Sequence, residues 1–450
     1  MEQFETIIQS ISGILWSWPM IVILLGTHIY LTIRLKFPQR KIFTAIKLSL
    51  HSDKKSKGDV SQFAALATSL AATIGTGNII GVATAISLGG PGAVFWCWIT
   101  GVLGMATKYS EGLLAIKYRI TNEKGEMSGG PMYALERGLK MKWLAVLFCI
   151  FTAISALGIG NMVQSNSIAL LVNDTWEIPT YISGLILSLL VALVIIFGVK
   201  GIAKVCTTLV PLMAIFYIGG CLWLLITNIN FVPSAISLII DSAFSTEAVG
   251  GGILGSAIMV AMRFGIARGL FSNESGLGSA PIVAAAAQTR NPVRQALVSA
   301  SGTFWDTVII CALTGIVLVS CIIAYPEIDT SLGGTLTTAA FSKLPFGGSV
   351  MLAISLFTFA FSTILGWCYY GEKAIEYLCS IRYIKLYRFI WIIAVFVGAI
   401  INLSIVWTIS DIMNALMAIP NIVSLVLLSG IIAHETKHYL WDNHLNDNGN

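Results

Sequence analysis

The chain has 450 residues, of which 56% are hydrophobic and 11% charged, and its formal net charge is +5. A soluble domain carries about 25% charged residues, so this composition excludes an ordinary soluble protein and indicates an integral membrane protein with many spans. The eight cysteines lie within or at the edges of apolar runs and form no Cys-x-x-Cys motif. We therefore expect no disulfide framework and no metal ligation by thiols.

The apolar runs predict an all-α fold with about eleven membrane spans, because about 20 apolar residues cross the hydrocarbon core as a helix. In chain order the runs are Leu15–Ile33, Phe63–Leu88, Ala93–Ile116, Trp143–Leu171, Tyr181–Gly198, Leu209–Ile229, Gly252–Ala287, Leu297–Ile323, Val350–Leu378, Phe389–Thr408 and Met413–Ala433. The seventh run is too long for one straight helix.

The second run is interrupted at residues 73–78, which read Thr-Ile-Gly-Thr-Gly-Asn. Glycine costs about 1 kcal/mol relative to alanine in a helix interior, and unpaired backbone groups are costly in lipid, so such a break persists only inside protein or beside a cavity. We predict that the N–H groups of Thr76 and Gly77 bind an anion there, while the preceding carbonyls face a cation. Close packing of small residues is the alternative for the two glycines, but it does not explain Thr76 and Asn78.

The basic residues favour one orientation. With the N-terminus outside, all but four of the 27 lysines and arginines fall on the cytoplasmic side or at its edge, and the exceptions are Lys108, Arg263, Arg268 and Lys343. Cytoplasmic loops carry an excess of such residues. The bias predicts an external N-terminus, a cytoplasmic C-terminus and an odd number of spans.

Polar or glycine-rich breaks are predicted near the middle of four spans, if each helical residue rises by about 1.5 Å. They are residues 73–78, residues 161–166, residues 268–273, and the group of Ser362, Thr363 and Trp367. Unrelated kinks would not be expected to align in depth, so we interpret these stretches as one binding site at the bilayer midplane.

Residues 74–83 weakly repeat in residues 275–284, which belong to the second and seventh predicted spans. These spans cross in opposite senses, as expected for a five-plus-five inverted repeat with one extra N-terminal helix. Coincidence is the alternative, because small residues recur in any packed bundle. The predicted divisions are an extra helix with a basic segment (1–58), the first repeat (59–230), the second repeat (231–433) and a polar cytoplasmic tail (434–450).

Five stretches carry specific motifs. They are GGPGAVFWCWITGVLG at 89–104, GTGNIIG at 75–81, GMATKY at 104–109, and the segments 263–281 and 359–372. In these stretches, and over nearly all of its length, the chain resembles the alanine or glycine:cation symporter family, also called sodium:alanine symporters. Cys97 stands where that family usually has methionine, which is a packing change. The resemblance implies the leucine-transporter fold and sodium-coupled uptake of small neutral amino acids such as alanine and glycine.

The resemblance also implies roles for single residues. The implied substrate residues are Thr76, Gly77, Asn78, Gln164, Phe271 and Trp367. The implied sodium residues are Ala71, Ile74, Phe359, Ser362 and Thr363, whose carbonyl and hydroxyl oxygens suit a hard cation. Trp367 would leave room for a methyl group but little more. From the residues alone, two alternatives stay open: the hydroxyls of Ser362 and Thr363 can bond to their own backbone, and Trp367 can be a core aromatic.

The charged residues of the seventh span each cost about 2.5–3.5 kcal/mol on insertion scales, so they must be paired or hydrated. We predict that Arg268 and Glu274 form a buried pair that stabilises the break and gates the inner path. The alternative assigns Arg268 to the substrate carboxylate, although the Thr76 and Gly77 amides already supply an anion site.

These expectations describe a secondary transporter that works by alternating access in the inner cell membrane. Sodium is the expected coupling ion, and we expect no other metal, no cofactor and no nucleic-acid partner. An uncoupled channel and a transporter coupled to another cation are the alternatives, although no repeated filter sequence favours a channel. An intramembrane enzyme with Ser279 as nucleophile is disfavoured, because no histidine or lysine in a span is evidently placed to serve as its base.

Overall fold

The computed structural model describes residues 2–51, 53, 56–245, 257–401 and 404–448. Nearly all of these residues are helical, and one short antiparallel hairpin, β1 (Ile120–Thr121) with β2 (Met127–Ser128), follows α6. An all-helical chain satisfies its backbone groups within each segment, as lipid requires. The predicted all-α class is confirmed.

The helices follow one another with short connections. Up to the middle of the chain they are α1 (Glu2–Leu15), α2 (Trp18–Arg34), α3 (Ile42–Ser49), α4 (Gln62–Thr73), α5 (Val82–Gly89), α6 (Gly92–Lys117), α7 (Pro131–Tyr133), α8 (Lys142–Leu157), α9 (Val163–Trp176), α10 (Thr180–Ile195) and α11 (Gly198–Thr227). The later helices are α12 (Val232–Phe244), α13 (Ala257–Asn273), α14 (Pro281–Ala284), α15 (Pro292–Thr303), α16 (Ala312–Ala324), α17 (Leu336–Phe341), α18 (Gly348–Leu378), α19 (Ile384–Ile400), α20 (Ser404–Leu427) and α21 (Ser429–Thr436). Wider π-turns continue several of them, at η2 (Gly77–Gly81), η3 (Ala134–Gly138), η4 (Gly158–Met162), η6 (Phe304–Cys311) and η9 (Lys437–Trp441).

Among the described residues, seven helical segments are long and apolar enough to cross a membrane, and the bent pair of α4 with the helix that follows it makes eight. The seven are Glu5–Arg34, Lys142–Trp176, Gly198–Thr227, Pro292–Ala324, Gly348–Leu378, Ile381–Ile400 and Ile405–Leu427. The third, fifth and seventh predicted spans, now α6, α10 and α13, are not among them. The chain is therefore a multi-pass membrane protein, and the total of eleven spans stays a prediction.

Two details of the predicted spans are wrong. The seventh does not break at residues 268–273, because α13 continues through Asn273 and the non-helical segment is 274–280. Gly269 serves close packing instead, since a Cβ atom there would lie 2.1 Å from Oγ1 of Thr100 on α6. The tenth does not run to Thr408, because α19 ends at Ile400 and α20 begins at Ser404.

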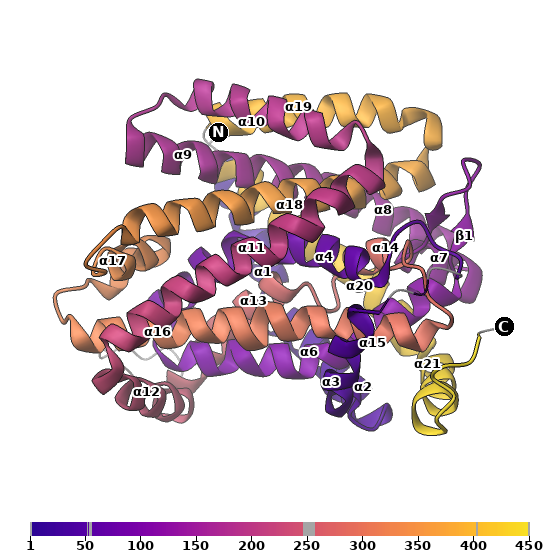
Figure 1. Cartoon of the computed structure of the whole chain (residues 1–450), viewed down its shortest axis with the longest axis horizontal. Coiled ribbons are helices and arrows are strands. Elements are labelled where there is room, and N and C mark those ends of the chain that lie inside the picture. Colours follow the sequence, from indigo (N-terminus) through magenta and orange to yellow (C-terminus); the bar gives the residue numbers. More distant parts are fainter. Residues whose placement is uncertain (1, 52, 54–55, 246–256, 402–403, 449–450) are drawn as a thin grey trace.

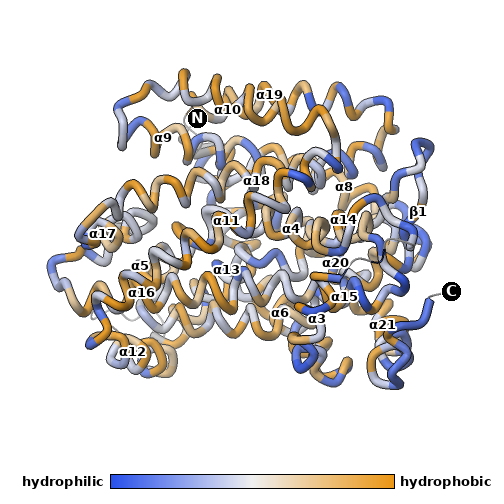
Figure 2. The backbone as a smooth tube through the Cα atoms, viewed as in Figure 1, coloured by the Kyte–Doolittle hydropathy of each residue, from blue (hydrophilic) through white to orange (hydrophobic). Residues whose placement is uncertain are grey.

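The long helices lie side by side in layers (Figure 1). In that view α6, α13 and α15 lie on one side and α8, α9, α10 and α19 on the other, with α4, α11 and α18 between them. Contacts agree, since α6 packs against α2, α13 and α15, and α18 packs against α4, α8 and α11. The tube of α10 and α19 is strongly apolar (Figure 2), and exposed leucines such as Leu189 and Leu193 suit a lipid-facing surface.

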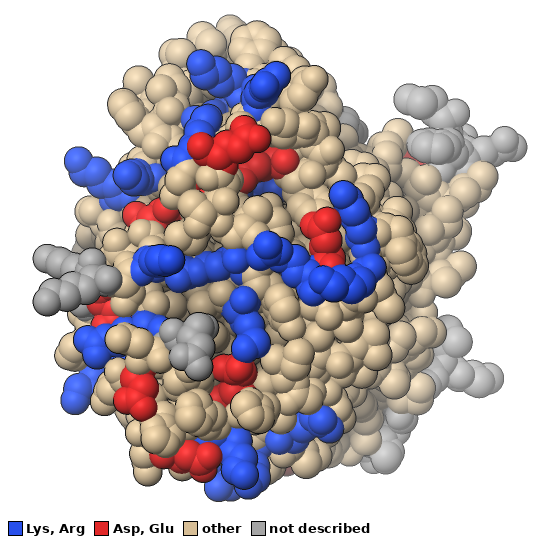
Figure 3. Space-filling model, turned by 90° about the vertical axis from the view of Figure 1, so that its right-hand side faces the viewer, with Lys and Arg blue, Asp and Glu red and all other residues tan. Residues whose placement is uncertain are grey.

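One end of the molecule, which carries the hairpin, α21 and the C-terminus, is rich in Lys and Arg (Figure 3). There the buried Asp53 carboxylate pairs with Nε of Arg290 at 3.2 Å and with Nε of Arg294 at 3.1 Å. Nη1 of Arg294 also donates to Oδ1 of Asn446 at 2.9 Å. Partial burial raises the pKa of the nearby Asp59 carboxyl, although the N–H of Met127 donates to it. These contacts join the loop before α4, the start of α15 and the C-terminal tail.

Candidate functional site

The helix that begins as α4 is interrupted where the sequence predicts. α4 ends at Thr73, Ile74 is extended with ψ 94°, and the two helical parts meet at a bend of 52°. The N–H of Gly75 donates to Oδ1 of Asn78 at 2.9 Å. A Cβ atom on Gly75 would lie 2.7 Å from Oγ1 of Thr363, so this glycine lets the break approach α18 closely.

Two backbone amides at the start of the second half-helix are available to a ligand. The N–H of Asn78 donates to the Gly75 carbonyl at 3.2 Å, whereas the preceding amides, of Thr76 and Gly77, find no acceptor in the described part of the chain. The first N–H groups of a helix lack partners within it, and the helix dipole makes this end favourable for an anion. The arrangement can therefore bind a carboxylate.

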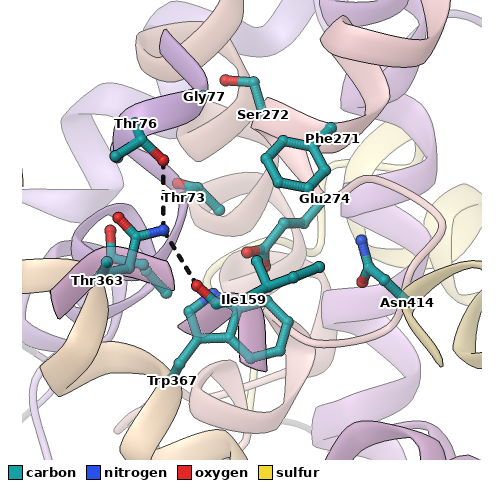
Figure 4. Close-up of a pocket in the computed structure, with 13 residues that line it drawn as sticks. Thr73, Thr76, Gly77, Ile159, Phe271, Ser272, Glu274, Thr363, Trp367 and Asn414 are labelled. Carbon is teal, nitrogen blue, oxygen red and sulfur yellow. Dashed lines mark hydrogen bonds between the residues drawn. The ribbon is translucent and has the colours of Figure 1, made fainter. Parts of the chain in front are cut away.

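A cavity lies between this half-helix, η4, α13, α18 and α20 (Figure 4). It is lined by Ala72, Thr73, Gly75, Thr76, Gly77, Ile159, Gln164, Phe271, Ser272, Glu274, Thr363, Trp367 and Asn414. The cavity has a volume of about 20 Å³, which is room for about one water molecule. The structure thus brings together Thr76, Gly77, Gln164, Phe271 and Trp367, five of the six predicted substrate residues.

Gln164 connects two sides of the cavity. Its Nε2 donates to Oγ1 of Thr76 at 3.3 Å and to the carbonyl of Ile159 at 3.1 Å, as the dashed lines of Figure 4 show. Ile159 belongs to the π-turn η4, in which carbonyl groups are less regularly paired than in an α-helix. Trp367 closes the cavity from α18, and a Cβ atom on Gly160 would lie 2.3 Å from its Cβ.

The predicted sodium residues gather where α4 faces α18. The Ser362 hydroxyl has two carbonyl acceptors within reach, that of Ala71 at 3.2 Å and that of Phe359 at 2.9 Å, and the Thr363 hydroxyl donates to the Phe359 carbonyl at 3.0 Å. The hydroxyls thus bond to their own helix, as the alternative expects, and Ser362 also reaches α4. Ile74 lies at the end of α4, one turn beyond Ala71. The five residues form an oxygen-rich contact, and their role as sodium ligands stays a prediction.

Asn78 does not line the cavity, which corrects its predicted place in the substrate pocket. It is fully buried, and its Nδ2 donates to Oδ1 of Asp306 at 2.8 Å while its Oδ1 accepts from the Gly75 N–H. Asn78 therefore caps the break and ties it to η6. A small amide can satisfy a donor and an acceptor at once, which suits it to this role.

Arg268 and Glu274 do not form the predicted pair. Among the described residues no ion pair joins them. Glu274 accepts a hydrogen bond from the Ser279 hydroxyl at 2.5 Å. Arg268 lines an adjoining cavity with Asp411, and this cavity shares Thr76, Gly77 and Phe271 with the first. The reason is geometric. α13 ends at Asn273 and Glu274 follows it with φ +53°, so the Glu274 side chain does not continue the face of α13 that carries Arg268.

Several cavity residues escaped the sequence analysis. Asn414 is a polar residue in an apolar run and was detectable, whereas Ile159 contributes a carbonyl that only the π-turn makes available. Ser272 lies on α13 beside Phe271, and both come close to Gly77, where a Cβ atom would lie 3.4 Å from Cδ1 of Phe271.

Comparison with known proteins identifies the family. A sequence model of the sodium:alanine symporter family matches residues 1–449. The chain belongs to this family. Its relatives include the sodium/alanine symporter AgcS of Methanococcus maripaludis, 49% identical over 97% of both chains, and a transporter of Haemophilus influenzae, 51% identical over 97% of this chain and 96% of its own. A further relative is the probable sodium/glutamine symporter GlnT of Bacillus subtilis, 37% identical over 97% of this chain and 90% of its own.

The sodium:alanine symporter family is a family of transporters and not a class of enzymes, so this chain is a membrane transporter of amino acids. Solved structures agree on the fold. A sodium-coupled sialic acid symporter matches with a TM-score of 0.52 and 11% identity, over 94% of this chain and 86% of its own. The Eremococcus coleocola manganese transporter matches with a TM-score of 0.53 and 16% identity, over 83% and 78%. At such low identity the likeness shows a membrane-transporter fold alone.

Proposed function

We propose that the chain carries small neutral amino acids, alanine and glycine, into the cell together with sodium by alternating access. The observation that supports this most is the juxtaposition of two free amides, at Thr76 and Gly77, with the oxygen-rich contact between α4 and α18. The amides bind the substrate carboxylate. At the second place the hydroxyls of Ser362 and Thr363 keep their protons but turn them away, and sodium is held by oxygens of Ala71, Ile74, Phe359, Ser362 and Thr363. Ion and substrate then stabilise one arrangement of the break.

A preference for the smallest amino acids rests on the walls of the cavity. Trp367 and Ile159 face the space that a substrate side chain would enter (Figure 4), and Gly160 holds the indole close. A pocket closed by an indole accepts a methyl group more easily than a long side chain. Glutamine is a useful competitor to test, because one relative is named as a probable sodium/glutamine symporter.

The interrupted helices also support the proposed architecture. α4 with α5 and α13 with α14 are the two broken spans, and they are the proposed first spans of two inverted repeats, 59–230 and 231–433. The extra helix pair α1–α2 precedes them. The basic end that carries the C-terminus (Figure 3) supports a cytoplasmic C-terminus and an external N-terminus in the inner cell membrane.

Uptake of labelled alanine into proteoliposomes tests the proposal. With sodium outside, we expect accumulation above the external concentration, which collapses when a sodium ionophore removes the gradient. Glycine should compete strongly, whereas leucine and glutamine should compete weakly. Equilibration without accumulation indicates a channel, and accumulation that follows another cation indicates a different coupling ion. Either result overturns sodium coupling.

A matched pair of variants tests the sodium site. Thr363→Ala should raise the sodium concentration for half-maximal uptake about tenfold, because a charged group loses one ligand. Thr358→Ala is the control, since this threonine also lies on α18 and bonds to its own helix, at the Ile354 and Ser355 carbonyls, but does not line the cavity as Thr363 does. Equal sodium dependence in both variants would remove Thr363 from the site.

A further inference from the structure

A neutral amino acid is a zwitterion, so a cavity that binds its carboxylate at Thr76 and Gly77 must also receive its ammonium group. The residues assigned so far bind the carboxylate and the sodium ion, and none of them binds the ammonium group. Building on that function, we propose that the Glu274 carboxylate binds the substrate ammonium and makes the transporter selective for amino acids over acids that lack the amino group.

Glu274 is placed to act on a ligand in the cavity. It follows the last residue of α13, is 4% exposed, and its carboxylate reaches into the space between Phe271 and Trp367 (Figure 4). Its backbone has φ +53°, in the left-handed region that side chains other than glycine rarely adopt. Gly276 and Gly278 in the same turn also have positive φ. The turn therefore places a glutamate where glycine would be less strained, and it aims the carboxylate inward.

The charge of Glu274 has little compensation within the protein. Of the residues that line the cavity it alone is ionisable, and Oε2 accepts one hydrogen bond, from Ser279. The charged groups that act on it electrostatically are Lys108 and Glu111 on α6 and Asp306 on η6, so one cation stands against two further carboxylates. Nζ of Lys108 donates to the Asn273 carbonyl at 2.8 Å, and no ion pair reaches Glu274 from the described residues.

The two neighbouring carboxylates differ from Glu274 because fixed donors hold them. Asp306 accepts hydrogen bonds from Asn78, Ser272 and Thr307. Glu111 accepts from the Gly276 N–H at 2.9 Å and from Nδ2 of Asn421 at 2.6 Å. Neither lines the cavity. A buried carboxylate with one hydrogen bond is costly, and a substrate ammonium supplies the charge that Glu274 lacks.

A second acceptor stands beside the same cavity. Asn414 on α20 is 2% exposed, and its Oδ1 has no hydrogen-bond partner among the described residues. An ammonium has three N–H donors and can satisfy both oxygens. The cavity thus offers donors at the Thr76–Gly77 end and acceptors at Glu274 and Asn414, a polarity that matches an amino-acid zwitterion.

Binding measurements on the purified full chain test this inference. In saturating sodium, Glu274→Gln should raise the Kd for L-alanine about 30-fold, the effect of losing a hydrogen bond to a charged group. The inhibition constant of L-lactate, which has a hydroxyl in place of the ammonium, should change by less than about twofold, because this neutral donor can bond to the glutamine amide oxygen as well as to the carboxylate. Glu274→Asp keeps the charge and should retain the preference for alanine over lactate.

Glu111→Gln is the matched control, because it also neutralises a buried carboxylate but outside the cavity. It should lower the thermal unfolding midpoint and leave the alanine-to-lactate preference unchanged. A folded Glu274→Gln variant that keeps the wild-type preference for alanine over lactate overturns the inference. So does a variant that loses sodium binding and weakens alanine and lactate binding equally, because Glu274 would then be a sodium ligand. Failure of the wild-type chain to bind alanine with sodium would instead overturn the proposed function.

Discussion

The two interrupted helices differ in how their broken backbone is satisfied. At the first break, between α4 and η2, one side chain, Asn78, caps Gly75, and the Thr76 and Gly77 amides stay free. At the second break, residues 274–280, side chains from other helices take the backbone groups: Glu111 accepts from Gly276, Asn421 donates to the Gly276 carbonyl, and Lys108 donates to that of Asn273.

This difference separates two tasks. Unsatisfied backbone groups are tolerated in a membrane only beside a ligand, water or protein partners. The first break keeps its donors for a ligand, whereas the second is fixed by its neighbours and directs one carboxylate, Glu274, into the shared cavity.

Removing the cap of the first break should have the largest effect. Asn78→Leu takes the acceptor from the Gly75 N–H and a donor from the buried Asp306, so we expect a loss of about 3 kcal/mol in unfolding free energy and no sodium-dependent uptake. Thermal unfolding in detergent and uptake in proteoliposomes measure both. Asn173→Leu is the control, because this asparagine bonds to the Ile178 carbonyl in an exposed place. Unchanged uptake in Asn78→Leu would mean that the break forms without its cap.

Loosening the second break should reduce stability more than binding. Asn421→Leu removes the donor to Glu111 and to the Gly276 carbonyl, and we expect a loss of about 2 kcal/mol in unfolding free energy. In the protein that stays folded, the Kd for alanine should change less than about threefold, since this residue does not line the cavity. A loss of alanine affinity as large as the loss of stability would show that both breaks bind ligand directly.

Ligand binding should protect the two breaks unequally. Sodium with alanine should slow hydrogen exchange of the Thr76 and Gly77 amides about tenfold, because bound carboxylate oxygens accept from them. The Gly276 amide already donates to Glu111, so its exchange should change much less. Mass spectrometry of peptides that cover residues 70–80 and 272–282 makes this comparison. Equal protection of both segments would contradict the assignment of the carboxylate to the first break.

Glycines show where sequence patterns were sufficient and where they misled. Gly75 and Gly77 stand with polar residues in an apolar run, and this local pattern predicted the first break correctly. Gly269 gives a similar signal, yet it lies within α13 and serves close contact with Thr100, while the turn uses Gly276 and Gly278. A glycine needed for packing and one needed for a turn look alike until the neighbouring helix is known.

The contact partners of charged residues, like the roles of these glycines, depend on neighbouring helices. Composition, apolar runs and motifs determined the membrane class, the helical fold, the family and the first break, because these depend on residue type and local spacing. Only the tertiary structure showed that Asn78 supports the break, that no ion pair joins Arg268 and Glu274 among the described residues, and that Glu274 lines the cavity. Such contacts join residues far apart in the chain, and their geometry depends on where each helix ends and which face it buries.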